Sequence, residues 1–367
     1  MTVPRRRAIA LAGLATAGLV LAGCGTEQPA EDGGGITVVA STNTWGSVAE
    51  AVGGQRVQVE SIISDPASDP HSYESSPRDA AKVSDADLVV FNGGGYDGFM
   101  EQILSTTAEG KPVVEAVAGT GAEGAHDHAH DHEGHGAEQH AHEGHGAEQP
   151  EHAHEDHGAE HPAQEHGAEP EQGHDEHAAH DEQGHDHAGH DHANEHVWYD
   201  LHVMHEVARR IAVELAELDP AHAGEYHRNA GAFSSEVGRL EGRVGALADA
   251  HRGREVLVTE PIAHYLVEAA GLRDITPQSF VNAVEAESDP SAAAVAEIQD
   301  AVNSGRAAAL IYNPQTASPV TRNIRAAAED KGVPVVEMTE TLPEGQSYVP
   351  WMRAQITALD DALNRSR

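Results

Sequence analysis

The stretch Ile-Thr-Val-Val-Ala-Ser at residues 36–41 is short, apolar and rich in β-branched side chains, which predicts a buried strand. Strands are also predicted at 57–63, 87–91, 112–117, 255–259, 308–312 and 333–336. Because these strands occur in two blocks with helical sequence around them, the pattern predicts an α/β fold of two lobes with mainly parallel sheets. In such sheets the ligand cleft lies at the carboxyl ends of the strands.

Helix signals separate the predicted strands. The pair Ser76-Pro77 combines a good N-cap with Pro at the first helical position, so a helix is predicted to begin there. Apolar spacing predicts a helix over 202–218 and a longer one over 221–251, between the two blocks of strands. The pair Asp289-Pro290 is predicted to start a helix of the second lobe in the same way.

The first 35 residues have the pattern of an export and anchoring signal. Arginines precede an apolar run over 8–22, which is too short to span a membrane and ends in Leu-Ala-Gly-Cys. This ending resembles the bacterial lipobox, so we expect a signal peptide at 1–23, lipidation of Cys24 and a flexible tether at 24–35. The alternative is an ordinary free Cys in a signal that is cut elsewhere. The mature protein is expected outside the cytoplasm, anchored by lipid to the outer face of the cell membrane.

Residues 123–195 hold 20 of the 28 His of the chain, together with 21 Asp and Glu and no Lys or Arg. A segment with so few large apolar side chains cannot bury enough surface to offset its ordering entropy, so it is predicted to be a disordered loop. Imidazole and carboxylate groups together suit borderline cations such as zinc, and we interpret the loop as a weak collector of metal. Its candidate ligands include His126, His128, His130, His132, His185, His187, His190 and His192. A solvated acidic spacer is the alternative interpretation.

Composition excludes several other functions. The 367 residues include 61 Asp and Glu against 22 Lys and Arg, a formal net charge of −39, whereas nucleic-acid binding needs a basic surface. A single Cys cannot form an intramolecular disulfide or a Cys-based zinc finger. We find no phosphate-binding loop with its Lys and no supported Ser-His-Asp or Cys-His arrangement, so no enzyme is expected. The run of three Gly at 93–95 is interpreted as a turn.

Four stretches place His or carboxylate side chains where predicted strands end: 69–74, 196–200, 259–265 and 338–343. There are two such stretches in each lobe. A single one would most simply be a solvated loop. Four together, in an exported chain, indicate a binding site in the cleft.

Several motifs resemble the zinc/manganese solute-binding lipoproteins of ABC importers. They are Asp-Pro-His-Ser-Tyr-Glu-Ser-Ser-Pro-Arg-Asp at 69–79, Ala-Asp-Leu-Val-Val-Phe-Asn-Gly at 86–93, His-Val-Trp-Tyr-Asp at 196–200, Tyr-Leu…Gly-Leu at 265–272 and Glu-Thr-Leu-Pro-Glu-Gly…Tyr…Trp-Met at 340–352. The resemblance covers roughly residues 36–363 apart from the His-rich loop. It implies two lobes joined by a long rigid helix, one ion in the cleft, and delivery to an ABC permease and its ATPase. We expect a monomer.

The resemblance also implies a set of four metal ligands: His71, His196, Glu260 and Glu340. The family places its third ligand five residues before the position of Tyr265, as His in zinc members and as Glu in manganese members. Counting back gives Glu260, and His264, on the same face of a helix, is the alternative. For the fourth ligand, Glu344 is the alternative to Glu340.

The identity of the metal follows from two opposing observations. Zinc accepts four ligands from imidazole and carboxylate, whereas manganese prefers more oxygen ligands and a larger coordination number. Glu260 favours manganese, and the His-rich loop favours zinc. We give the loop more weight and expect Zn²⁺ as the cargo, with Mn²⁺ (or iron) as the alternative.

Two other functions compete with metal import. A metal-dependent hydrolase would need an open coordination position and a substrate pocket. A zinc-buffering or adhesion lipoprotein would lack neighbouring genes for a permease and an ATPase. The expected boundaries after the tether are an N-terminal lobe at 36–122, the His-rich loop at 123–195, the end of that lobe at 196–220, a linking helix at 221–251 and a C-terminal lobe at 252–367.

Overall fold

Two parallel sheets organise the part of the chain that the structure describes, residues 35–107, 110–120, 194–286 and 288–366 of a computed structural model. The first sheet has the order β2-β1-β3-β4 and consists of β1 (Ile36–Thr42), β2 (Val57–Ile63), β3 (Leu88–Phe91) and β4 (Val113–Glu115). The second has the order β6-β5-β7-β8 and consists of β5 (Glu255–Val258), β6 (Arg273–Asp274), β7 (Ala309–Tyr312) and β8 (Val335–Glu337). The two lobes therefore share one topology.

Neighbouring strands in both sheets are parallel and in continuous register. Ile36 of β1 lies opposite Val57 of β2, and Val256 of β5 lies opposite Ala309 of β7. Because parallel strands end at the same edge of a sheet, the loops after β2, β5, β7 and β8 can bring their side chains to a common place.

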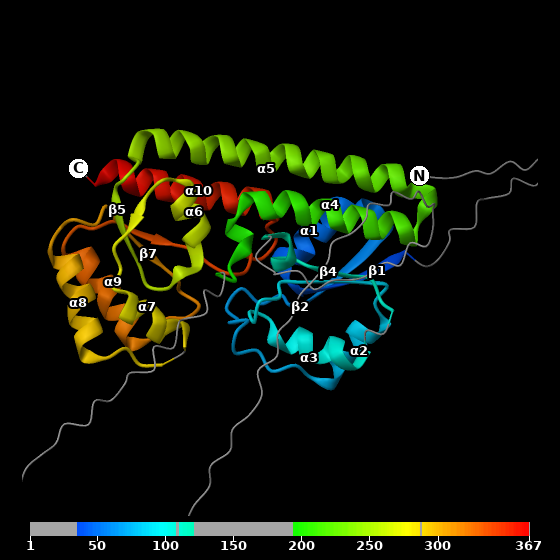
Figure 1. The fold of residues 1–367 in the computed structure, drawn as a ribbon, viewed down its shortest axis with the longest axis horizontal. Helices are drawn as coiled ribbons and strands as arrows, with labels where there is room; N and C mark the ends of the chain where they lie inside the picture. Colours follow the sequence, from blue (N-terminus) through cyan, green and yellow to red (C-terminus); the bar gives the residue numbers. More distant parts are fainter. Residues whose placement is uncertain (1–34, 108–109, 121–193, 287, 367) are drawn as a thin grey trace, which may run out of the picture. The chain divides into compact units, whose positions relative to one another are not determined.

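Helices cover both faces of each sheet (Figure 1). The helices of the first lobe are α1 (Asn43–Gly53), α2 (Pro77–Asp85), α3 (Gly98–Thr107) and α4 (Leu201–Leu218). Those of the second are α6 (His264–Ala269), α7 (Gln278–Glu285), α8 (Ala292–Asn303), α9 (Pro319–Asp330) and α10 (Tyr348–Arg365). Between them, the 29-residue helix α5 (Ala223–His251) packs on α1 and α4 of the first lobe and on α6 and α10 of the second.

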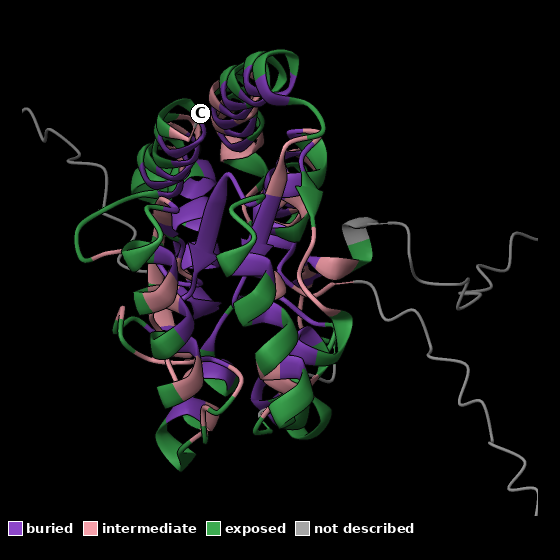
Figure 2. Cartoon of the chain, turned by 90° about the vertical axis from the view of Figure 1, so that its left-hand side faces the viewer, coloured by how far each residue is buried: buried purple, intermediate pink, exposed green. Residues whose placement is uncertain are grey.

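One hydrophobic core runs through both lobes. Val38 of β1 and Val256 of β5 belong to the same buried cluster, to which α4, α5 and α10 contribute. The next residue in each strand points to the opposite face of its sheet. Val39 packs towards α2 and α3, and Leu257 packs towards α7, α8 and α9. The sheets are thus buried on both faces (Figure 2), which explains why their strands are continuous apolar runs rather than alternating ones.

The structure confirms the predicted fold class, an α/β fold of two lobes with parallel sheets and a long helix between them. The predicted cap at Ser76-Pro77 is also confirmed. The Ser76 hydroxyl accepts a hydrogen bond from the Asp79 N–H, and the Asp79 carboxylate accepts one from the Ser76 N–H.

The predicted helix start at Asp289-Pro290 is wrong. Helix α8 begins at Ala292, and Ser291 is its N-cap, because the Ser291 hydroxyl accepts a hydrogen bond from the Ala294 N–H at 3.2 Å. Ser is as good a capping residue as Asp, and here it is the one whose oxygen reaches the third amide of the helix.

Residues 1–34 and 121–193 lie outside the described residues. The predicted signal peptide, the lipidation of Cys24, nearly all of the tether and almost all of the His-rich loop fall there. Within the described ranges, no helix is long and apolar enough to cross a membrane.

Candidate metal centre

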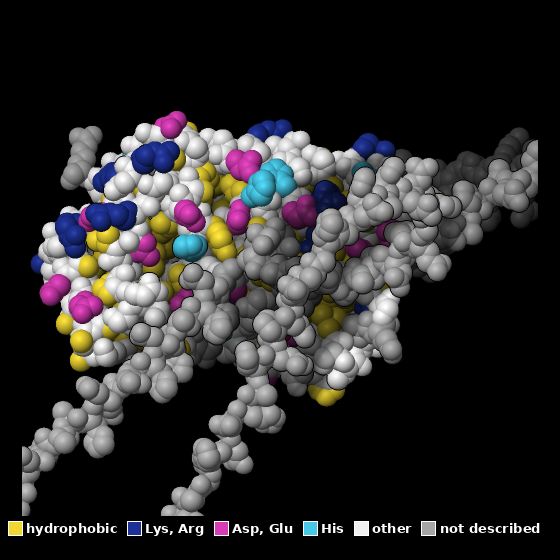
Figure 3. Space-filling model, in the orientation of Figure 1, with side chains coloured by type: hydrophobic (Ala, Val, Ile, Leu, Met, Phe, Trp, Pro, Cys, Tyr) yellow, Lys and Arg dark blue, Asp and Glu magenta, His cyan; other side chains and the backbone are white. Residues whose placement is uncertain are grey.

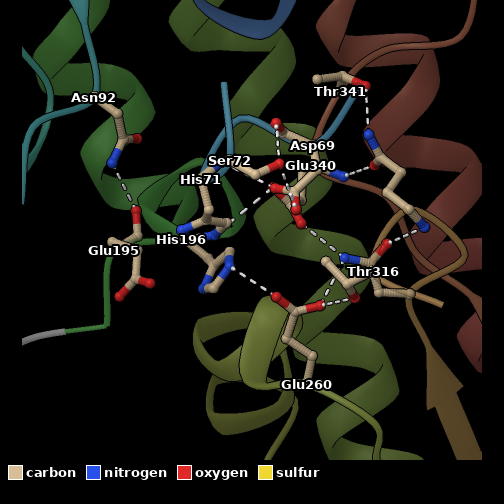
Figure 4. Close-up of polar contacts among 12 residues, drawn as sticks. Asp69, His71, Ser72, Asn92, Glu195, His196, Glu260, Thr316, Glu340 and Thr341 are labelled. Atoms are coloured by element: carbon tan, nitrogen blue, oxygen red, sulfur yellow. Dashed lines mark hydrogen bonds and ion pairs between the residues drawn. The ribbon is translucent and has the colours of Figure 1, made fainter. Parts of the chain in front are cut away.

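Four side chains from four loops meet between the lobes (Figure 4). They are His71, His196, Glu260 and Glu340, and one potential ligand atom of each lies within 4.8 Å of the others. His71 Nε2 is 3.9 Å from Glu340 Oε2, and His196 Nε2 is 4.0 Å from Glu260 Oε1. The structure therefore brings together the same four residues that the sequence analysis selected as ligands.

A tight turn after β2 positions His71. The Asp69 carboxylate accepts hydrogen bonds from the His71 N–H at 2.9 Å and from the Ser72 hydroxyl at 3.3 Å. The His71 ring packs edge-on against the buried ring of Tyr96, with 4.9 Å between the centroids. These contacts hold the imidazole with Nε2 towards the other three residues.

The neighbouring residue Asn194 orients His196. Asn194 Oδ1 accepts a hydrogen bond from the His196 N–H at 2.9 Å and lies 3.0 Å from His196 Nδ1. Because this oxygen can only accept, Nδ1 carries the ring proton and Nε2 presents its lone pair to the cleft. Asn194 also joins the lobes, since its Nδ2 donates to the Pro261 carbonyl at 3.0 Å and its carbonyl accepts from the Tyr265 hydroxyl at 2.6 Å.

The turn after β3 supports the chain that leads to His196. The Asn92 side chain donates to the Glu195 carbonyl at 2.8 Å. Gly93, Gly94 and Gly95 all have positive φ, which Gly adopts most readily, and the buried Asp97 carboxylate accepts from the Asn92 and Gly93 N–H groups at 2.7 and 2.8 Å. Burial raises the pKa of Asp97 to about 6. The predicted turn is confirmed.

The loop after β7 supplies hydrogen-bond partners to both Glu260 and Glu340 of the second lobe. Asn313 Nδ2 donates to Glu260 Oε2 at 2.7 Å and to Glu340 Oε1 at 2.8 Å. The Thr316 hydroxyl donates to the same Glu260 oxygen at 2.5 Å, and Gln315 Oε1 accepts from the Glu340 N–H at 2.6 Å. Sequence reasoning missed these three polar residues because it searched strand ends for His and carboxylates only.

The loop that carries Glu340 is attached to the first lobe. The Thr44 hydroxyl of α1 donates to the Glu340 carbonyl at 3.1 Å. The Asn43 side chain makes two bonds of 2.9 Å, from its Nδ2 to the Leu342 carbonyl and from the Leu342 N–H to its Oδ1. Glu340 is therefore positioned by both lobes.

Burial disfavours charge on both carboxylates. It raises the pKa of Glu340 well above its ordinary range, and the negative charges of Glu260 and Asp69 raise it further. Burial also raises the pKa of Glu260, although the hydrogen bonds from Thr316 and Asn313 oppose this shift. A cation between the two groups would favour their charged forms.

The imidazole of His196 is affected in the opposite direction. Burial lowers its pKa well below the usual value, and the proximity of His71 and His264 lowers it further, so this ring is neutral. His71 Nε2, His196 Nε2 and Glu340 Oε2 are buried and have no hydrogen-bond partner among the described residues. Unpaired buried polar atoms are costly, and a divalent cation would give all three a partner.

The structure separates the alternative ligands from this cluster. The His264 side chain is 52% exposed and pairs with Glu268 at 3.8 Å. Figure 3 shows that some His side chains lie on the surface of the molecule. Glu344 is also exposed. Asp200 caps α4 by accepting from the His202 N–H at 2.9 Å.

A cavity of about 300 Å³ lies beside the four side chains. Five acidic residues and one His line it: Asp69, Glu195, Glu260, Glu285, Asp289 and His71. A negatively lined cavity that leads to buried carboxylates attracts cations and repels anions.

The two-lobed fold and this cluster of imidazoles and carboxylates define a metal-binding solute-binding protein. The chain belongs to the family described as "ZnuA: Zinc-uptake complex component A periplasmic", whose profile matches residues 38–362. Membership confirms the prediction of a transport protein rather than an enzyme.

Relatives that bind different metals are similar to this chain. A "High-affinity zinc uptake system protein ZnuA" from Brucella suis is 28% identical over 93% of this chain and 95% of its own length. A "Manganese-binding lipoprotein MntA" from Halalkalibacterium halodurans is 34% identical, but the match spans only 30% of this chain and 39% of that protein. The solved structure of the "periplasmic zinc binding protein TroA" from Treponema pallidum has the same fold, with a TM-score of 0.60, 16% identity and coverage of 90% and 99%.

Proposed function

We propose that the protein captures Zn²⁺ outside the cytoplasm and delivers it to an ABC permease driven by a cytoplasmic ATPase. The observation that carries this proposal is the convergence of His71, His196, Glu260 and Glu340, three of which present buried atoms with no partner in the described structure. Two carboxylates balance the charge of one divalent cation, and two imidazole nitrogens complete its shell. A shell of four protein ligands leaves no position for an attacking water, which suits a carrier.

Two observations favour zinc as the cargo. Two imidazoles and two carboxylates complete a four-coordinate zinc shell, and the His-rich loop supplies further groups that bind zinc better than manganese. Manganese is the second candidate, because Glu260 stands where a His would favour zinc and because an MntA lipoprotein is among the relatives.

Titration of the purified protein with Zn²⁺, Mn²⁺ and Cd²⁺ tests the cargo, with and without residues 123–193, a deletion that keeps Asn194 and Glu195 beside His196. We expect zinc to bind more tightly than manganese in both forms, because the four residues lie outside the deleted segment. Tighter binding of manganese than of zinc in both forms would contradict the proposal.

The His-rich loop is proposed to collect zinc weakly and to raise its concentration beside the cleft. Ligation requires the neutral imidazole, so the loop should release metal as the pH falls through about 6–7. Cells that carry a deletion of 123–193, which keeps Asn194, should grow more slowly at limiting zinc and normally at ample zinc. Unchanged uptake at limiting zinc would leave the loop as an acidic spacer.

Anchoring through Cys24 is proposed from the lipobox-like sequence before it. The variant Cys24→Ala should no longer incorporate a labelled fatty acid and should appear in the soluble fraction. Labelled acid in this variant would place the anchor elsewhere.

A further inference from the structure

The side chain of Asn313 lies between the two carboxylates of the cluster. It is 1% exposed, directly follows β7, and donates from one nitrogen to Glu260 and to Glu340. Its oxygen accepts from the Gln315 N–H at 3.0 Å, so the amide is fixed with its nitrogen towards the carboxylates. An amide suits this position because its nitrogen carries two hydrogens, one for each carboxylate, and the group adds no negative charge.

These hydrogen bonds divide the oxygens of each carboxylate into two kinds. Glu260 Oε2 accepts from Asn313 and Thr316, whereas its Oε1 lies 4.0 Å from His196 Nε2. Glu340 Oε1 accepts from Asn313, whereas its Oε2 has no partner in the described structure and lies 3.9 Å from His71 Nε2. Each carboxylate therefore offers one oxygen to a cation and holds the other in a hydrogen bond.

Counting the atoms that remain gives two imidazole nitrogens and two carboxylate oxygens. Four ligands of this kind satisfy zinc, whereas manganese prefers more oxygens and a coordination number near six. If both carboxylates were bidentate, the same four residues would supply six ligand atoms. The geometry points to Asn313 as a specificity-determining residue, which keeps both carboxylates monodentate and so favours zinc over manganese. This inference rests on the proposed zinc function.

Three substitutions test this role. Asn313→Leu has a similar volume and removes both hydrogen bonds to the carboxylates, together with the one from the Gln315 N–H. Asn313→Ser keeps a single donor, so a result is available if the first variant does not fold. Asn229→Leu is the matched control, because it removes an amide that donates to the Val52 carbonyl at 2.9 Å between α5 and α1, away from the cluster.

Two measurements report on the variants. The visible absorption of bound Co²⁺ reports coordination number, because four-coordinate Co²⁺ absorbs much more strongly than six-coordinate Co²⁺. Competition between Zn²⁺ and Mn²⁺ reports selectivity. We expect strong absorption from the wild type and Asn229→Leu, weaker absorption from both Asn313 variants, and a fall of about tenfold or more in the ratio of zinc to manganese affinity.

The outcomes separate this inference from the proposed function. Weak Co²⁺ absorption from the wild type, or absorption and selectivity unchanged in both Asn313 variants, would overturn the role of Asn313 while leaving zinc as the cargo. A wild type that prefers manganese would contradict the zinc proposal. In that case, a loss of Co²⁺ absorption in the Asn313 variants would still support control of coordination number by Asn313, and no loss would refute it.

Discussion

The two lobes have the same strand order but contribute different chemistry to the cleft. The first lobe supplies imidazole nitrogens from His71 and His196, and the second supplies carboxylate oxygens from Glu260 and Glu340. The same physical cause, burial, acts on both sides. It keeps His196 neutral by lowering its pKa, and it promotes the neutral form of Glu340 by raising its pKa.

This difference separates two tasks. The neutral His196 can bind a cation without losing a proton. The raised pKa values of Glu260 and Glu340 mean that these carboxyl groups lose their protons less readily, and a bound cation favours their charged forms. We therefore expect the first lobe to provide affinity for the cation that does not depend on losing a proton. We expect the second lobe to make cation binding depend on pH.

The largest effect is expected from removal of a first-lobe ligand. His196→Ala should weaken zinc binding by roughly 100- to 1,000-fold, about a quarter of the ~10–16 kcal/mol that a four-ligand zinc shell supplies. Competition with a chelator of known affinity measures the loss. A zinc affinity within threefold of the wild type would show that the imidazole of His196 is not a main source of the affinity for zinc.

A smaller loss of zinc affinity is expected when His196 is kept but the hydrogen bond that orients its ring is removed. Asn194→Leu removes the acceptor that fixes the His196 tautomer, and such changes weaken metal binding by about 10- to 100-fold. Asn194→Asp restores the acceptor while removing the donor to the Pro261 carbonyl. Recovery of affinity in the Asp variant would assign the effect to the tautomer, and no recovery would assign it to the link between the lobes.

The second lobe should control the pH dependence of stability without metal. The pKa of Glu340 is raised on folding above the ordinary value of 4.5, so the folded chain keeps a proton that the unfolded chain loses. The free energy of unfolding should therefore fall as the pH rises from 4.5 through the raised pKa, by at most about 1.4 kcal/mol per pH unit. Urea denaturation in the presence of a chelator measures this slope.

Glu340→Gln is the matched variant for that experiment, because Gln keeps the shape of the side chain and cannot lose a proton in this range. The fall in stability with rising pH should be smaller in this variant. An equal fall in both proteins would show that another group is responsible.

The smallest effect is expected at His264, which sequence analysis kept as an alternative ligand. Its side chain is half-exposed and pairs with Glu268, so His264→Ala should change zinc affinity by less than about twofold. A loss comparable to that of His196→Ala would mean that His264 enters the shell when metal binds.

Patterns along the chain predicted most of the fold. The apolar strands, the cap at Ser76 and the long helix between the lobes all carry local signals that the structure retains. Strand β6 has no such signal, because its two residues, Arg273 and Asp274, are exposed and polar. They pair with β5 through the backbone and through an ion pair of Arg273 with Glu255. The cap at Ser291 was missed because Asp289-Pro290, two residues earlier, has equally good local chemistry.

The candidate ligands were predictable for a different reason. His and carboxylate side chains at strand ends are chemically conspicuous, and the family resemblance selected among them. Asn313 and Asn194 were missed because an amide carries no such signal and acts only through its neighbours. Asn313 does follow a predicted strand directly, so a search of strand ends for all polar residues would have found it.

The core that α4, α5 and α10 share between the lobes should make the two lobes a single cooperative unit in heat denaturation. The side chains on the inner faces of both sheets pack in this shared core, so unfolding of one sheet would expose apolar side chains of the other. The lobes should therefore unfold together in one calorimetric transition. A cation bound at the cleft then stabilises every residue of that unit, by an amount that grows with the logarithm of its concentration above the dissociation constant.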